Sequence, residues 1–440
     1  MTIKFEKTRQ VLSAFAGLPV FCSLFDRFLT ADSSKLQMLP TTSRTPESGL
    51  SKLKLLSMAF IAGAECLDDV DKLSVDPGFS SLCSVKPFGA KTMGNFLRGF
   101  NSSQCKELNI EGAKAAFKLR SAIDKKPQPI IFDIDSTSNE QYARYMEGVE
   151  FNYEGKKCLS TIQVFDELGF QYWNDVRPGA THTSTDSEEI IHRIFTAMPS
   201  NLRTLTHLVR ADSGYCKTRF MLACTAKNAN FLICMRSIMY RPLVPIVAEW
   251  KKQNLHDPKR IRYVGDRECE IGSTTYRLKN TPYSFRVVIL RALKEDAIGK
   301  LLITDEDYDY QGWITNLEAE SPAEIISIYR GRGHCENFVR ELKNGFDLHH
   351  YPCQKLNANK AYGIIAAISH NLIRLVALKD SMMKPKFAKA VRFHFVHIPC
   401  MVVRHAGDII FRLMDYHLKG VMKFLLEVQK TCLASHGGAT

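Results

Sequence analysis

The sequence predicts a mixed α/β fold, with a sheet in the middle of the chain and helical regions at both ends. Short runs rich in β-branched and aromatic residues alternate with turns and with a helical segment at 187–197. Helical periodicity fades after residue 237 and returns at Pro322. This order is typical of an α/β sheet interrupted by a β-rich insertion. The predicted strands are 129–135, 158–165, 170–176, 205–211, 231–235, 284–290 and 312–317.

The same patterns divide the chain into regions. Residues 1–125 form a mostly helical N-terminal region. The α/β domain occupies 126–236 and 319–380, and the β-rich insertion 237–318 separates its two parts. Residues 381–440 form a basic helical C-terminal region. We therefore expect one interrupted domain between two helical regions.

Composition indicates a globular protein with a basic surface. Of its 440 residues, 45% are hydrophobic and 24% are charged, which excludes a collagen-like or disordered chain. Lys and Arg outnumber Asp and Glu by 59 to 46, giving a net charge of +13. This excess favours a polyanionic partner, nucleic acid before a membrane, although charge alone does not identify one. Residues 379–432 carry ten basic and four acidic side chains.

Other compositional signals argue against secretion and against a cysteine-based metal site. The N-terminus lacks a signal-peptide pattern, and polar residues interrupt the most apolar stretch, 361–378, which predicts a buried core helix. We therefore expect a cytoplasmic protein. The 13 cysteines show no C-x-x-C spacing. His349, His350 and Cys353 lie close in sequence, but an ordinary loop is the favoured interpretation.

The N-terminal region contains a candidate DNA-reading helix. A Pro-, Ser- and Thr-rich stretch at 37–51 indicates a linker, an apolar helix is predicted at 53–66, and Asp76-Pro77-Gly78 is typical of a turn. Residues 91–98 form either the second helix of a helix-turn-helix or a plain helix of a bundle. In the first case the residues that contact DNA would be Lys91, Thr92 and Arg98.

Two aspartates occupy similar places in the predicted sheet. Asp135 and Asp212 each end a predicted strand just before a small polar turn. Carboxylates at the carboxyl ends of neighbouring strands open onto the crevice where α/β proteins bind ligands. Asp also favours turns for purely local reasons, so a structural role stays open. Asp133 faces the same side as Asp135 and is its rival, but Asp135 is preferred because it precedes the turn.

A third group of polar residues lies near residue 336. Tyr329, Arg332, Glu336 and Lys343 stand at offsets of 0, 3, 7 and 14, which place them along one stripe of a helix. A phenol, a guanidinium, a carboxylate and an ammonium in a row suit a site that handles a metal and a phosphodiester. A solvated charged face is the alternative, and Gly331 and Gly333 indicate an irregular first turn.

These four residues match Tyr-x2-Arg-x3-Glu-x6-Lys with every spacing kept. This pattern is the YREK signature of bacterial insertion-sequence transposases of the DDE superfamily, and its surroundings resemble the subgroup whose domain is called DDE transposase group 1. The likeness spans about residues 50–380; one local departure is Ser138-Asn-Glu-Gln141, which replaces the usual His-Gly. Other similar stretches are 67–71, 76–77, 133–137, 177–182, 210–214, 315–317 and 366–375.

The resemblance implies a ribonuclease H-like catalytic domain, with the β-rich insertion between the second and third acids. Two Mg²⁺ ions would be held there, with Mn²⁺ as a substitute. The implied catalytic acids and metal ligands are Asp135, Asp212 and Glu336. The implied DNA-contacting residues are Tyr329, Arg332 and Lys343.

Two further features have both a DNA-binding and a structural interpretation. Trp313 lies in a predicted strand of the insertion, where core packing is favoured over stacking on a displaced base. In the C-terminal region, Ile409, Ile410 and Leu413 follow helical spacing, as do Val421, Phe424 and Leu425. Such a helix is either a solvated surface helix or one that offers a basic face to DNA phosphates. The cations in question are Lys384, Lys386, Lys389 and Arg392.

Three functions remain open at this point. The favoured one is a cut-and-paste transposase that cleaves and joins DNA at the terminal inverted repeats of its element. The others are a nuclease of the same fold that only hydrolyses DNA, and an inactive DNA-binding repressor. Expected partners are double-stranded terminal-repeat and target DNA, with a homodimer in the DNA complex and no membrane. The expected location is the cytoplasm, in association with the nucleoid.

Overall fold

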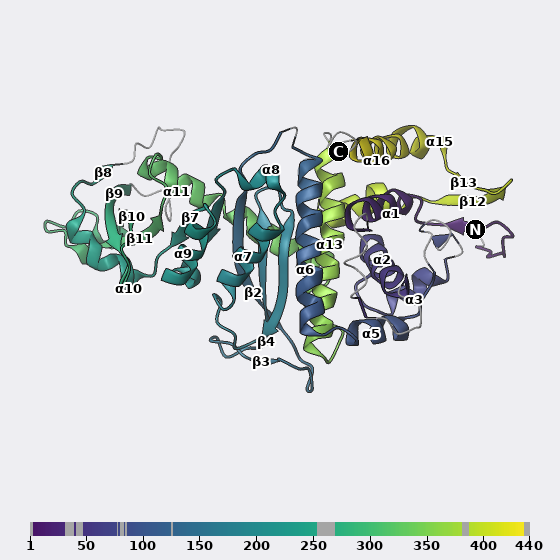
Figure 1. Cartoon of the computed structure of the whole chain (residues 1–440), viewed down its shortest axis with the longest axis horizontal. Helices are drawn as coiled ribbons and strands as arrows, with labels where there is room; N and C mark the ends of the chain where they lie inside the picture. Colours follow the sequence, from purple (N-terminus) through teal and green to yellow (C-terminus); the bar gives the residue numbers. More distant parts are fainter. Residues whose placement is uncertain are drawn as a thin grey trace.

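In the computed structural model a large mixed sheet occupies one part of the molecule. Two long helices, Ser102–Ser121 and Leu356–Lys379, separate it from segments of the N-terminal and C-terminal regions that pack together (Figure 1). Part of the predicted linker, Pro77, Lys384 and Lys386 lie outside the described residues. The structure describes residues 3–30, 39–40, 47–76, 78–79, 83, 86–124, 126–252, 269–380 and 387–434.

The large sheet has ten strands and confirms the predicted mixed α/β class. Its order is β3-β4-β2-β6-β7-β11-β10-β9-β8, with β5 also paired to β4. Strands β2, β4 and β5 are antiparallel neighbours, whereas β6 and β7 run parallel to β2. The strands are β2 (Ile131–Glu140), β3 (Glu150–Phe151), β4 (Lys157–Asp166), β5 (Gln171–Pro178), β6 (Leu208–Ala211), β7 (Asn230–Cys234), β8 (Lys251–Lys252), β9 (Cys269–Arg277), β10 (Ser284–Leu293) and β11 (Tyr308–Thr315).

Helices cover the sheet and build the terminal regions (Figure 1). The helix predicted at 187–197 is found with those bounds as α7. The helices are α1 (Leu18–Phe25), α2 (Glu47–Ala62), α3 (Asp69–Ser74), α5 (Ala90–Arg98), α6 (Ser102–Ser121), α7 (Ser187–Ala197), α8 (Ser200–Arg203), α9 (Thr218–Ala226), α10 (Ser237–Tyr240), α11 (Pro322–Arg330), α12 (Gly333–Gly345), α13 (Leu356–Lys379), α14 (Ala388–Val391), α15 (Asp415–His417) and α16 (Lys423–Ala434).

The β-rich insertion continues the sheet. Residues Trp313–Thr315 of β11 pair antiparallel with Leu232–Cys234 of β7, and β10, β9 and β8 follow outward. The described part of the insertion is therefore joined to the strands around Asp212 by backbone hydrogen bonds.

Helix α13 is the apolar core helix that the sequence predicts. It is long and apolar enough to cross a membrane, but 94% of its apolar window is buried inside the structure. Its polar groups bond to β5 and to the turn before it: His370 Nε2 lies 3.0 Å from the Gly169 carbonyl, and Asn371 exchanges two 2.7 Å hydrogen bonds with the Gln171 backbone. Hydrogen-bonded side chains such as Asn371 are typical of a buried helix in a folded core, whereas Nδ1 of His370 has no hydrogen-bond partner among the described residues.

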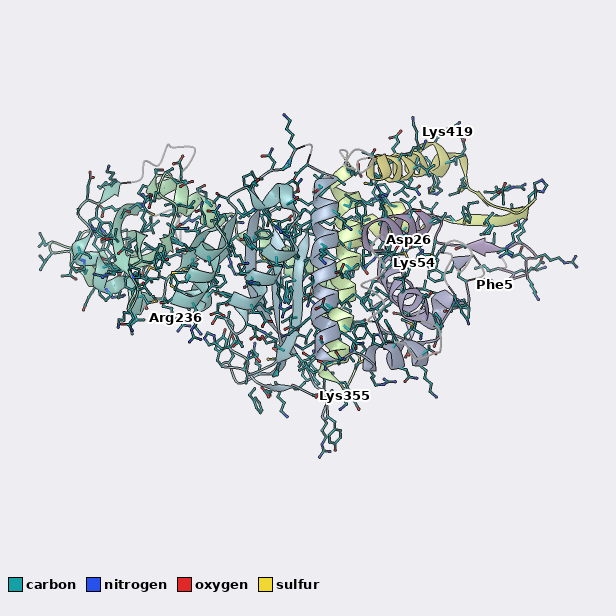
Figure 2. All side chains as sticks on the ribbon, viewed as in Figure 1. Phe5, Asp26, Lys54, Arg236, Lys355 and Lys419 are labelled. Atoms are coloured by element: carbon teal, nitrogen blue, oxygen red, sulfur yellow. The ribbon has the colours of Figure 1, made fainter. Side chains whose placement is uncertain are left out.

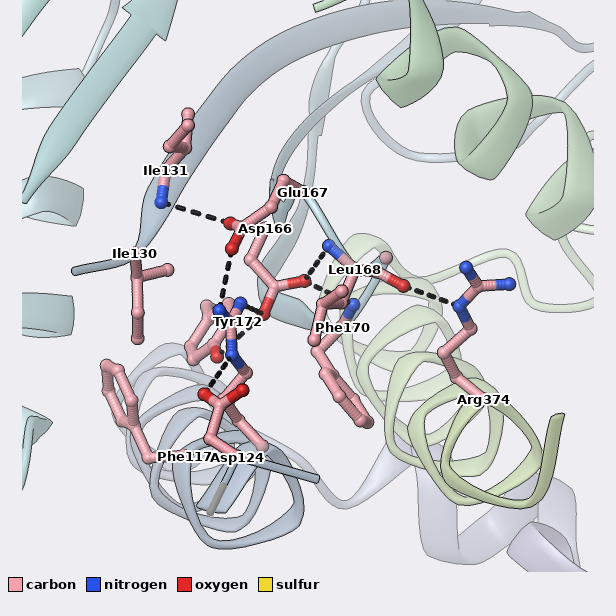
Figure 3. Close-up of polar contacts among 12 residues, drawn as sticks. Phe117, Asp124, Ile130, Ile131, Asp166, Glu167, Leu168, Phe170, Tyr172 and Arg374 are labelled. Atoms are coloured by element: carbon pink, nitrogen blue, oxygen red, sulfur yellow. Dashed lines mark hydrogen bonds and ion pairs between the residues drawn. The ribbon is translucent and has the colours of Figure 1, made fainter. Parts of the chain in front are cut away.

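A buried ionic network fixes the start of β2 (Figure 3). Arg120 of α6 donates to Asp166 Oδ2 at 2.8 Å and to Glu167 Oε1 at 2.6 Å. The other oxygen of Glu167 accepts from the backbone N–H of Ile131 at 3.0 Å. Arg374 of α13 holds the same turn through the Leu168 carbonyl at 2.5 Å. The first residue of β2 is thus tied to both long helices.

Segments from the N-terminal and C-terminal regions lie side by side. Strand β1 (Leu12–Ser13) pairs with β12 (Cys400–His405), which pairs with β13 (Asp408–Arg412), and α1 packs on α16 (Figure 1). Lys54 of α2 forms a 2.7 Å ion pair with Asp26 just after α1 (Figure 2). The N-terminal and C-terminal regions therefore pack together.

The C-terminal prediction needs correction at the hairpin β12–β13. Ile409 and Ile410 lie in β13 and are exposed, so the helical interpretation of this stretch is wrong. Ala406 and Gly407 both have positive φ, 49° and 88°, and form the two-residue loop of a β-hairpin. Helix is found further on, where α16 buries Leu425.

Arg392, one of the cations predicted for the basic face of the C-terminal region, does not lie at the surface. Arg392 is buried and donates to the carbonyl oxygens of Phe60 at 2.8 Å, Ile61 at 3.3 Å and Gly345 at 2.5 Å. It therefore joins the chain ends to α12 and is not available to DNA phosphates. Lys389 is exposed, as predicted.

Candidate active site

Strand register brings Asp135 and Asp212 together. Ile134 of β2 pairs with Ala211 of β6 in parallel register, so the two aspartates are the next residues on adjacent strands. Neighbouring strands lie about 4.8 Å apart. Asp212 ends β6 as predicted, and its Oδ1 accepts from the Gly214 N–H at 2.8 Å. The first two acids thus lie side by side.

The predicted turn after Asp135 is wrong. Strand β2 runs on to Glu140, and its residues Ser136–Glu140 pair with β4. Local propensity favours a turn for this polar sequence, but pairing with the long strand β4 overrides it. On the other side of β2, the ladder with β6 ends at Ala211, one residue before Asp135 would pair.

The Asp135 carboxylate is held in a crowded electrostatic setting. Its side chain is 18% exposed, and Arg332 Nη2 lies 2.8 Å from its Oδ1. The Ser136 N–H donates to the same oxygen at 3.0 Å. Burial raises the pKa of Asp135 to about 6, with Asp212 and Glu336 adding to this effect, while Arg332 opposes it. The three predicted acids therefore act on one another electrostatically.

Glu336 approaches this pair from a helix. It lies in the first turn of α12 and its side chain is exposed. A carboxylate in a first helical turn is favoured by the helix dipole. α12 packs across β2 and β4 through contacts such as Phe338 on Phe165, whose ring centroids are 5.8 Å apart. The middle of β2, the end of β6 and the start of α12 thus supply the three acids.

The four YREK residues do not lie on one continuous helix. Tyr329 belongs to α11, Arg332 lies between α11 and α12, and Glu336 and Lys343 belong to α12. A Cβ on Gly331 would lie 2.6 Å from Arg210 Nη1, so glycine permits the close approach at this break. The break lets the Arg332 side chain reach Asp135.

Lys343 and Tyr329 flank the acids. Lys343 Nζ donates to Thr137 Oγ1 at 2.6 Å and to the Ser138 carbonyl at 3.1 Å, and burial lowers its pKa. Tyr329 is half-buried, and burial raises its pKa, with Cys234 and Asp212 among the contributing groups. Both groups therefore lie at the border of the acidic centre, that is, the carboxylates of Asp135, Asp212 and Glu336.

Asp133 is not part of the acidic centre. Arg210 forms two hydrogen bonds of 2.7 Å with the two carboxylate oxygens of Asp133, and both side chains are almost fully buried. The same guanidinium donates to the Ile328 carbonyl of α11 at 2.5 Å. Asp133 thus holds β2, β6 and α11 together, and Asp135 remains the first acid.

Trp313 has a packing role. It is fully buried, and its ring lies 5.8 Å from that of Tyr329, so it supports Tyr329 from the core and cannot stack on a displaced base. The favoured interpretation from the sequence, core packing, is confirmed.

The candidate DNA-reading residues lie apart from the acids. Lys91, Thr92 and Arg98 are on α5, which packs on α2, α3 and α13 beyond the long helices (Figure 1). Lys91 and Arg98 are exposed, and Thr92 is half-buried. Arg98 Nη2 donates to Asn95 Oδ1 at 2.6 Å. The helix is present with two exposed cations, and its role in reading DNA stays a prediction.

Sequence reasoning missed a basic rim around Asp212. Burial, Lys217 and Arg236 lower the pKa of His182, while Asp212 raises it, so these groups lie near one another. Lys217 and Arg236 are exposed, and Figure 2 shows Arg236 at the surface. Both cations follow strands β6 and β7 at the edge that carries Asp212. A search for cations just after each predicted strand could have found them.

The sheet defines an α/β protein, and Asp135 of β2, Asp212 after β6 and Glu336 of α12 form an acidic centre. The family model described as Transposase DDE domain group 1 matches residues 36–428. The chain belongs to this family of DDE transposases. A solved structure that the chain is similar to is the cryo-EM structure of the piggyBac transposase synaptic complex with hairpin DNA, with a TM-score of 0.44, 9% sequence identity, and coverage of 98% of this chain and 85% of that chain. No curated protein sequence matches the chain.

Proposed function

We propose that this transposase works by cut and paste: it cleaves DNA at the terminal inverted repeats of its element and joins the freed 3′ ends to target DNA. The observation that carries the proposal is the convergence of Asp135, Asp212 and Glu336 in a chain of the DDE family. The sheet supports a ribonuclease H-like core, because the order β5-β4-β2-β6-β7 combines three antiparallel strands with two that run parallel to β2.

The donor set of the site suits Mg²⁺, with Mn²⁺ as a substitute. Asp135, Asp212 and Glu336 offer hard carboxylate oxygens, and a bound cation would stabilise the ionised form of Asp135, whose pKa is raised mainly by burial and further by Asp212 and Glu336. These residues would hold two ions. Bound there, the ions would supply activation of the attacking hydroxyl and stabilisation of the leaving oxygen.

The surrounding side chains would handle the DNA backbone. Arg332 is paired with Asp135, and when a cation neutralises that carboxylate the guanidinium becomes available to a phosphate next to the cut. Lys343 and Tyr329 border the same centre and would position the DNA end. Lys217 and Arg236 would extend the phosphate contacts along the sheet edge.

We infer the oligomeric state, the helix that recognises the DNA ends and the cellular location from this cut-and-paste reaction. Two element ends must be cut together, which calls for a homodimer in the DNA complex. Helix α5, through Lys91, Thr92 and Arg98, would recognise the terminal repeats. The protein would work in the cytoplasm on nucleoid DNA.

The test is to replace Asp135, Asp212 and Glu336 singly by Ala. Each variant should lose DNA cleavage by at least about 1,000-fold in Mg²⁺, because each removes a ligand from a shared site. Binding to terminal-repeat DNA should persist in a gel-shift assay. A variant that cleaves like the wild type would remove its residue from the site.

The competing function is a nuclease of the same fold without strand transfer. Purified protein, pre-cleaved terminal-repeat DNA with free 3′-hydroxyls and a supercoiled target plasmid separate the two. Joined products support the transposase, whereas hydrolysis without joining supports the nuclease.

A further inference from the structure

A second group of possible metal ligands follows the end of α12. The carboxylate of Asp347 and the ring nitrogens of His349 and His350 all lie within 4.8 Å of one another. His350 Nδ1 is 3.1 Å from Asp347 Oδ1, and His349 Nε2 is 3.4 Å from the same oxygen. Cys353, which the sequence places nearby, is buried and does not belong to the group.

The spacing of these atoms fits a small tetrahedral ion. Bonds of about 2.0–2.1 Å in a tetrahedron put neighbouring ligand atoms roughly 3.3 Å apart. The two nitrogen–oxygen distances, 3.1 and 3.4 Å, bracket that value. An ion could therefore enter with small shifts of the side chains.

Hydrogen bonding already orients one ligand. His349 Nδ1 lies 2.8 Å from the Lys343 carbonyl oxygen, which can only accept, so Nδ1 carries the proton. The Nε2 atom then faces a carboxylate oxygen of Asp347 at 3.4 Å, and either a second ring proton or a bound cation can bridge this pair. A backbone carbonyl behind the ring is the usual support of a metal-binding histidine.

The backbone is also set for this purpose. Asp347 has a φ of 52°, a left-handed conformation that is uncommon outside glycine. The Gln141 side chain donates to the His349 carbonyl at 2.7 Å and fixes the loop against the end of β2. Strained residues held by their surroundings are concentrated at functional sites.

We propose that Asp347, His349 and His350 bind a transition-metal ion of the Zn²⁺ class, separate from the acidic centre. Imidazole ligands favour Zn²⁺ and its neighbours over Mg²⁺. Three protein ligands leave a fourth position, and the exposure of His349 (41%) and His350 (62%) makes it open to solvent. Because His349 bonds to the Lys343 carbonyl, the ion would also brace the end of α12.

The test uses Co²⁺ as a spectroscopic substitute in the full-length protein at pH 8, with Mg²⁺ at a few millimolar to occupy the acids. At this pH a histidine of ordinary pKa, about 6.5, is neutral. One equivalent of Co²⁺ should give the intense visible absorption of a four-coordinate ion, and Zn²⁺ should abolish it. The variants H349Q, H350Q and D347N should each weaken Co²⁺ binding by at least about tenfold.

Matched controls separate this site from adventitious Co²⁺ binding and from a loss of folding. H192Q removes an exposed histidine of α7 and should bind Co²⁺ like the wild type. Without metal, the Tm of H349Q and H350Q should lie within about 5 °C of the wild type, because each loses exposed or half-buried hydrogen bonds of about 1 kcal/mol, and D347N keeps a residue that tolerates positive φ. Absorption that survives in H349Q and H350Q, or that disappears in D135N, would overturn the proposal, as would a wild type that shows no saturable absorption.

Discussion

Asp133 and Asp135 stand two residues apart on β2 and face the same side of the sheet, yet their partners give them different roles. Arg210 neutralises Asp133 with two hydrogen bonds deep in the core. Asp135 has one ion pair, with Arg332, and shares its surroundings with two other acids. The difference arises from the next strand, because β6 places a cation beside Asp133 and a carboxylate beside Asp135.

This contrast predicts a stability gain for Asp135→Asn in the metal-free protein. The folded-state pKa of Asp135 is raised from 3.8 to about 6, so ionisation costs the fold stability as pH rises from about 4 to about 6. The variant avoids this cost and should be more stable by about 1–3 kcal/mol above pH 6.5. The difference from the wild type should vanish near pH 4. Denaturant unfolding across this pH range measures it.

Asp133→Asn is the matched control for that experiment. Burial raises the pKa of Asp133 as well, but this variant leaves the buried Arg210 guanidinium without the carboxylate that binds it through two hydrogen bonds, so it should destabilise the protein by about 3–5 kcal/mol at neutral pH. If the two variants changed the free energy of unfolding by the same amount and in the same direction, the assignment of Asp133 to the core and of Asp135 to the acidic centre would be wrong.

At the scale of elements, the sequence predicts what depends on local periodicity. Helix α7 has its predicted bounds, and the apolar helix α13 is buried as expected. The missed features depend on contacts between distant segments. Ser136–Glu140 forms a strand because it pairs with β4. The sequence predicts a helix at the β12–β13 hairpin because its apolar residues happen to follow helical spacing.

In the candidate site, too, the features that depend on local sequence could be predicted and those that depend on distant contacts could not. The sequence predicts that Asp135 and Asp212 are neighbours, because the two residues follow Ile134 and Ala211, which pair in parallel register, but it does not predict that β2 continues beyond Asp135. The position of Glu336 follows from the family signature. The pairing of Arg332 with Asp135 is not predictable, because it depends on the break at Gly331 and on how α12 packs across β2.

Helix α5 can be tested without removing the N-terminal region, which packs on α13 and would expose the core if deleted. Replacing Lys91 and Arg98 by Ala should reduce the preference for terminal-repeat over random duplex by on the order of tenfold, because base contacts carry specificity. Competition gel shifts measure this ratio. Lys72 and Lys106, exposed on α3 and α6, provide a double variant of equal charge that should keep it. An unchanged preference would move recognition away from α5.

At the scale of the molecule, the basic excess should act through phosphate contacts. Lys389, Lys423 and Lys430 are exposed on the C-terminal helices. Replacing all three by Ala should weaken binding to specific and random DNA by similar factors. It should also flatten the slope of log K against log salt by up to roughly 0.9 for each phosphate that the variant no longer neutralises. An unchanged slope, equal to that of a variant lacking Lys72, Lys106 and Lys279, would show that these charges serve only solubility.

The ladder between β7 and β11 has three residue pairs, Trp313–Thr315 with Leu232–Cys234, and a 2.8 Å bond from the Met235 N–H to the Gly312 carbonyl extends it, whereas β2 and β4 pair over nine residues. This short ladder predicts that the insertion opens as a cooperative unit of its own, with amides of β9 and β10 exchanging with deuterium before those of β2 and β4. Uniform protection across the whole sheet in native-state exchange would contradict this.

The pairing between β7 and β11 also determines how a pulling force would pass through the sheet. Strand β7 ends beside Arg236 and neighbours β6, whose end carries Asp212. DNA that pulled on the insertion would load these three residue pairs in shear, and the force would pass along β7 to the acid-bearing edge. The insertion would then serve as a lever arm, by which tension in the bound DNA reaches the cutting residues through the sheet itself.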